Sequence, residues 1–158
     1  MSATALPGFI DALAALLTLR AGLAGVHVFT CPVAPEDLGS EAIELAPETS
    51  VEQQVAAMGS HDIEEAFDVR GSIVCYQAMT GSGAVTSINV AAKAARDRAC
   101  AILEEVTDAL AGDDTVSGSV RDAQITGITL RQGMAPEGQL GRLCQVEFTI
   151  HAEAQTTP

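Results

Sequence analysis

Residues able to bind metals are few and widely spaced. His27, His61 and His151 are far apart, and none has a second His or Cys at the spacing of a zinc motif. His27 and His151 both fall in expected strands, so the two side chains could be neighbours in the folded sheet. An isolated strand histidine is nevertheless most often an ordinary polar residue. The sequence therefore predicts no metal site.

The cysteines indicate packing rather than catalysis. The chain has four, with no C-x-x-C spacing. Cys31 precedes Pro32 in an expected loop and could be an exposed thiol, but no base that would activate it can be identified. Cys75 and Cys144 fall on the apolar phases of expected strands and are interpreted as small buried side chains. Free thiols of this kind indicate a reducing compartment.

Carboxylates and glycine-rich turns offer weak evidence for an active site. A catalytic acid usually needs a buried setting that raises its pKa. The paired acids fall on faces or turns expected to be solvated, so they are interpreted as surface charge: Glu36–Asp37, Glu64–Glu65, Glu104–Glu105 and Asp113–Asp114. Gly81-Ser82-Gly83 precedes a helix but lacks the patterns of phosphate-binding loops. The sequence therefore predicts no catalytic residues and no cofactor.

The length and net charge of the chain limit the number of domains and the kinds of molecule it can bind. The chain has 158 residues, 47% of them hydrophobic, and a net charge of −13. This length fits a single domain, residues 1–158. The negative charge argues against wrapping nucleic acid or binding an anionic membrane. The apolar run at 12–19 is too short to span a bilayer, and no basic residue precedes it as in a signal peptide.

Two stretches have the periodicity of helices. Apolar residues recur at helical spacing in the first, predicting a helix over about 6–23. A second helix is predicted over about 87–111, with a stripe that runs from Val85 through Ala95 to Ala109. Alanines in the middle of that stripe favour close docking on a sheet over a coiled coil.

Alternating apolar and polar residues predict a mostly antiparallel sheet packed against these helices, an α+β fold. Strands are expected at 26–30, 62–77, 120–131 and 142–152. A further strand begins near Ile43 and is expected to end at Pro47, which leaves 46–62 as an ambiguous, extended segment. Gly71 is expected to mark a bulge or bend, and a change of phase near Gly127 predicts a bulge. Residues 153–158 are expected to be a polar tail.

Six segments together carry a family resemblance. They are the apolar helix with Leu13, Leu16 and Leu17, the strand 26–29 before a Pro-rich loop, the strand through 67–69, the Ala/Arg-rich helix around 94–99, the turn 113–118 and the closing strand 146–150. In order and texture they resemble the small tail-terminator and tail-completion proteins of long-tailed bacteriophages and prophages. The resemblance covers nearly the whole chain.

The resemblance implies a structural minor tail protein of the virion, not an enzyme. Such subunits assemble in the host cytoplasm into a ring, typically a hexamer, at the head-proximal end of the tail. The ring caps the tail-tube protein and presents a surface to the head-completion or connector protein. DNA passes through its lumen without specific binding, and acidic subunits would favour sliding over adhesion. No membrane is involved.

Two long loops are the candidate contacts between subunits or with the tail tube. They are 31–40 and 132–141, with the residues Cys31, Pro32, Pro35, Glu36, Asp37, Met134, Pro136 and Glu137. Alternatives to a terminator are another head–tail connector, a tail-tube subunit, a non-viral module that binds a small molecule, or an enzyme whose site is assembled from distant residues.

Overall fold

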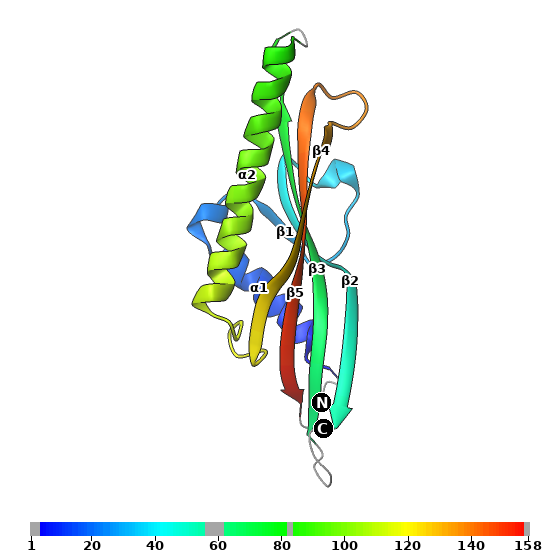
Figure 1. Cartoon of the computed structure of the whole chain (residues 1–158), viewed down its shortest axis with the longest axis vertical. Coiled ribbons are helices and arrows are strands. Elements are labelled where there is room, and N and C mark those ends of the chain that lie inside the picture. The colour runs from blue at the N-terminus through cyan, green and yellow to red at the C-terminus, as the bar shows by residue number, and fades with distance from the viewer. Residues whose placement is uncertain (1–3, 56–61, 82–83, 157–158) are drawn as a thin grey trace.

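The computed structural model describes residues 4–55, 62–81 and 84–156, and it confirms the α+β class (Figure 1). Five strands form one sheet in the order β1-β2-β3-β5-β4. Their bounds are β1 His27–Phe29, β2 Glu41–Val55, β3 Ile63–Ala78, β4 Asp122–Met134 and β5 Gly141–Thr156. Only the β1–β2 pair is parallel, and the other three pairs are antiparallel.

Both helices pack on the same face of the sheet. Helix α1 spans Leu6–Thr18, and α2 spans Val85–Gly112 and lies along β3, β5 and β4 (Figure 1). The first predicted helix is therefore too long at its end, because the chain leaves α1 at Thr18 and makes a 3-10 turn over Ala21–Leu23. Arg20 at this break forms an ion pair with Glu105 of α2 at 2.7 Å.

The alanines of α2 bring the helix close to the sheet, as predicted. Ala95 and Ala99, both on the predicted stripe, are 3% and 0% exposed. The stripe was wrongly expected to pass through Ala92, which is half-buried, and Ala91 is the buried residue there, at 3% exposed. Small side chains allow this close approach and leave the filling of the core to larger residues from the sheet and α1. Val85 was wrongly placed on the buried stripe: it is 73% exposed, because the first turn of α2 projects past the end of the sheet (Figure 1).

Strand β2 is longer than predicted. It continues through Pro47 to Val55, so the expected end at Pro47 is wrong. The register of β2 against β3 shifts between Leu45 and Thr49, and proline is tolerated at such an irregularity because the regular ladder is already interrupted there. Residues 46–55 of the ambiguous segment are thus strand, while residues 56–61, with His61, lie outside the described residues.

The predicted C-terminal hairpin is confirmed, with its bulge. Strands β4 and β5 pair antiparallel, and their register shifts between Ile125 and Gly127. The predicted tail is partly wrong, because residues 153–156 belong to β5 and Ala154 is buried opposite Glu65. The prediction for Gly71 is also wrong: β3 pairs with β5 through this residue without a shift, and the irregularity lies on β2 opposite it.

Candidate assembly surface

The two predicted contact loops meet over the face of the sheet opposite the helices. Loop 30–40 lies on this open face, where Glu44 accepts a hydrogen bond from the Val33 N–H at 3.0 Å. Loop 135–140 approaches it from the β4–β5 hairpin, and a shared cleft forms between them. The cleft is lined mainly by Pro35, Leu38, Val74, Tyr76, Pro136 and Leu143.

Tyr76 links the two loops. Its N–H donates a hydrogen bond to the carbonyl oxygen of Ser40 at 2.8 Å, and its hydroxyl donates to that of Leu140 at 3.1 Å. A second bond to Leu140 comes from the N–H of Met79 at 3.1 Å. Segments far apart in the sequence are therefore held together as one surface.

The predicted contact residues are all exposed, and all except Met134 lie in these two loops. Cys31, Pro32, Pro35, Glu36 and Asp37 belong to the first loop, with the last three forming a 3-10 turn. Pro136 and Glu137 belong to the second loop. Met134 was wrongly assigned to that loop, since it ends β4 opposite Arg142. The strand was expected to end at residue 131, before Gly133, but β4 continues to Met134.

Edge strand β4 carries exposed apolar residues, of which the sequence analysis named only Met134 as a contact. Ile128 is 57% exposed, Leu130 39% and Met134 78%, and Leu140 in the adjoining loop is 74% exposed. The first three lie on the face that the helices cover elsewhere, since Ile128 and Leu130 are paired with the buried residues Phe148 and Val146. An apolar edge strand is a ready site for pairing with another chain. The sequence held no signal for it, because alternation does not reveal whether a helix covers that end of the strand.

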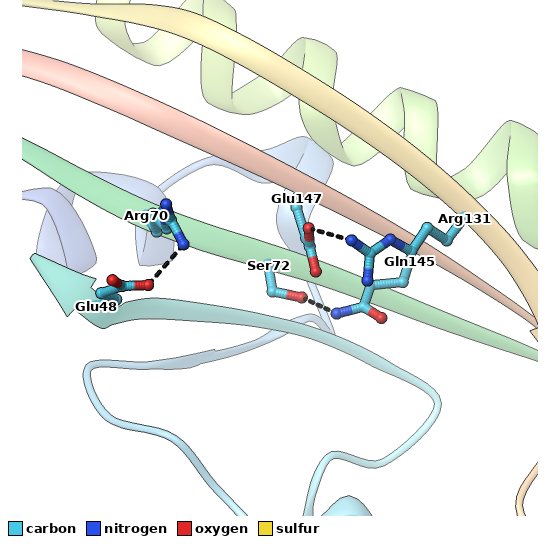
Figure 2. A network of polar contacts seen from close by, with 6 residues as sticks. All are labelled: Glu48, Arg70, Ser72, Arg131, Gln145 and Glu147. Carbon is cyan, nitrogen blue, oxygen red and sulfur yellow. Dashed lines mark hydrogen bonds and ion pairs between the residues drawn. The ribbon is translucent and has the colours of Figure 1, made fainter.

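The open face of the sheet is polar and internally paired (Figure 2). Arg70 contacts Glu48 at 2.6 Å, Arg131 contacts Glu147 at 3.3 Å, and Gln145 donates a hydrogen bond to the Ser72 hydroxyl at 3.0 Å. These residues come from β2, β3, β4 and β5, and all of them except Arg131 line a hollow across the sheet. Most charges in it are well exposed, so each ion pair contributes little to stability.

His27 and His151 do not come together. His27 lies on β1 and His151 on β5, with β2 and β3 between them. His151 Nδ1 lies 2.8 Å from a carboxylate oxygen of Asp68 on the open face. Across residues 4–55, 62–81 and 84–156, no group of three or more His, Cys, Asp and Glu side chains is placed to hold a metal ion.

The expected burial of Cys75 and Cys144 is confirmed. They lie directly opposite each other on β3 and β5 and are 1% and 0% exposed. Burial, with a smaller effect from Glu41, raises the pKa of the Cys75 thiol to about 12, and burial also raises the pKa of Cys144. Cys31 is exposed.

Thiol labelling should separate these cysteines. A neutral, buried thiol is a poor nucleophile, whereas an exposed one reacts freely. In mildly alkaline buffer we expect Cys31 to react with a chromogenic disulfide reagent at once and Cys75 and Cys144 only after unfolding. Replacing Cys31 with serine should remove the fast phase and leave a slower phase from Cys100, which is half-buried. A fast phase that survives this replacement and maps to Cys75 would contradict the assignment.

No helix in the described ranges is both long and apolar enough to cross a bilayer. A search against protein-family models finds no match to the chain, and a search of curated proteins finds no related sequence. Inference about function therefore rests on this surface and on the resemblance noted from the sequence.

Proposed function

We propose that this chain is a structural assembly subunit, a tail terminator whose ring caps the tail tube of a bacteriophage and joins it to the head connector. The observation that carries the proposal is the exposed apolar surface of β4 and loop 135–140, next to loop 30–40. Isolated exposed apolar residues are ordinary, but a contiguous group on an edge strand marks a surface for another protein. The family resemblance indicates that this other protein is a second subunit of the ring, the tail-tube protein or the head connector.

Charge supports the passage of DNA through the ring. The net charge is −13, and carboxylates outnumber the two arginines, Arg70 and Arg131, on the open face of the sheet. The carboxylates are Glu44, Glu48, Glu52, Glu64, Asp68, Asp122, Glu147 and Glu153. Such a wall repels the phosphate backbone and lets it slide. We propose that this open face, rather than the helical face, is turned toward the lumen.

Light scattering after size exclusion, combined with negative-stain imaging, tests the proposal. We expect closed rings, or a monomer that forms one ring at one end of purified tail tubes. A monomer or dimer that ignores the tubes would overturn the proposal. Repeated stacking along the tube would instead identify a tube subunit. Binding to the head connector without binding to the tube would identify another head–tail connector.

Met134 and Leu140 are the residues we expect to contact the tube. Because both are largely exposed, replacing them together with serine should change stability by less than about 0.5 kcal/mol. Loss of two central apolar contacts should weaken tube binding by at least about tenfold. Leu19→Ser is the matched control, since Leu19 is 85% exposed at the end of α1. Equal binding by the control and the double variant would remove this surface from the proposal.

A further inference from the structure

The sheet has two open edges along its described residues. Strand β4 is the last strand on one side, so the backbone groups that face away from β5 have no strand partner. On the other side, β1 pairs only with Ala42–Glu44 of β2, which leaves residues 48–52 of β2 at an open edge. Unpaired edges of this kind invite pairing with another chain.

The directions of the strands allow one copy to continue the sheet of the next. β2, β3, β5 and β4 are neighbours in that order, and each is antiparallel to the one before it. If a second copy follows in the same orientation, its β2 meets β4 of the first copy antiparallel. The alternation then continues without a break, and the helices of both copies stay on one face.

Side chains of the two edges match in one register. Placing Ile128 of one copy opposite Val51 of the next brings together two exposed apolar residues, 57% and 41% exposed, both on the helical face. Opposed residues in antiparallel strands have Cβ atoms about 5 Å apart, close enough for such side chains to pack. Leu130 then lies opposite Thr49, so neither of these apolar residues of β4 faces a charge.

Charges match in the same register. Arg131 falls opposite Glu48 of the next copy, and both side chains lie on the open face (Figure 2). From Gly127 to Met134 the only charged residue is Arg131, whereas residues 48–55 of β2 carry Glu48 and Glu52 and no basic residue. The junction would join two existing ion pairs, Glu147–Arg131 and Glu48–Arg70, into one alternating row.

We propose that copies of this chain join head to tail through their sheets, with β4 residues 127–131 pairing antiparallel with β2 residues 48–52 of the next copy. The inference deepens the proposed function and rests on it, because a head-to-tail contact generates a ring when the rotation closes and a filament when it does not. Met134 and Leu140 lie beyond the paired segment.

Cross-linking between two chains that each carry one introduced cysteine tests the register. Val51→Cys and Ile128→Cys are each made in a chain that also carries Cys31→Ser, and the two are mixed with tail tubes under mild oxidation by diamide. We expect disulfide-linked dimers in the mixture and in neither chain alone. Val90→Cys replaces Val51→Cys in the control, since Val90 is 64% exposed on α2, and it should give none.

Each outcome bears on the two proposals differently. Rings on tubes without Val51–Ile128 cross-links would overturn edge pairing and leave the terminator function standing. Cross-linked filaments without rings would support edge pairing and overturn the terminator function. Dimers from the Ile128→Cys chain alone would show a two-fold contact between β4 strands and would overturn the head-to-tail arrangement, as would a mixture that forms neither cross-links nor rings.

A charge exchange gives an independent readout. Arg131→Glu and Glu48→Arg should each weaken association by at least about tenfold, because each places like charges across the junction. A chain that carries both exchanges again has opposite charges across the junction, so its association should recover. Lys93→Glu on α2 makes the same change of charge as Arg131→Glu and should leave association unchanged. A double variant as weak as the single variants would contradict the register.

Discussion

Replacing Gly71 with alanine is expected to lower the free energy of unfolding by about 3 kcal/mol. A Cβ atom at this position would lie 2.2 Å from Cζ of Phe148 and 2.6 Å from its Cε2. The Phe148 ring is only 2% exposed, and both residues lie on the central strands β3 and β5, so neither the ring nor the backbone has room to move. Denaturant unfolding followed by circular dichroism measures the change.

Gly133→Ala is the matched control for this prediction. It lies on β4, and a Cβ there would meet nothing within 4 Å, so its replacement should change stability by less than about 0.5 kcal/mol. Phe148→Leu offers a second check, because shortening the ring should remove most of the extra cost of alanine at position 71. If Gly71→Ala and Gly133→Ala behaved alike, the close approach of the ring would not be the reason for the glycine.

The role of Gly71 shows where reasoning from sequence stops. A glycine inside a strand is typical of a bulge, a bend or a close contact, and the pattern around it is the same in each case. Only the pairing of β3 with β5 brings Phe148, far along the chain, against this residue. The alternation of Phe67, Val69 and Ile73 is a local property, and the sequence predicted it correctly.

The contact surface was predictable to a similar degree. Proline and glycine placed the two loops, because these residues interrupt regular structure wherever they fall. The sequence did not predict that Tyr76 links the two loops, because its hydrogen bonds join segments that are far apart in the chain. The exposure of Ile128 and Met134 depends on where α2 stops covering β4, which no local pattern encodes.

Glu65 is the position at which the sequence analysis was most clearly wrong. It was interpreted with Glu64 as surface charge, but its side chain points to the helical face and is 2% exposed. Its carboxylate accepts hydrogen bonds from the Ala5 N–H at 2.7 Å and from the Gln53 amide at 3.0 Å, and it is also bonded to the Thr4 side chain. The buried acid thus fastens the start of α1 to the sheet, and a carboxylate near a helix N-terminus is further stabilised by the helix dipole.

Glu65→Ala is expected to lower the free energy of unfolding by about 2 kcal/mol, because it removes a buried, charged acceptor from the Ala5 N–H and the Gln53 amide. Glu64→Ala is the control on the same strand. The Glu64 side chain is 55% exposed and its ion pair with Arg121 is long, at 3.8 Å, so this change should cost less than about 0.5 kcal/mol. Thermal and denaturant unfolding at neutral pH compare the two variants with the unaltered chain.

The contribution of Glu65 should also depend on pH in a defined direction. Burial raises the pKa of this carboxyl, but the hydrogen bonds from Thr4, Ala5 and Gln53 together outweigh it and hold the pKa below its ordinary value of 4.5. A carboxyl with a lowered pKa in the folded state stabilises the fold above pH 4.5, and this stabilisation is lost as the pH falls through the folded value. The stability difference between the unaltered chain and Glu65→Ala should therefore be constant near neutrality and shrink in acid. A difference that stayed constant into strong acid would mean that shape rather than charge holds α1 in place.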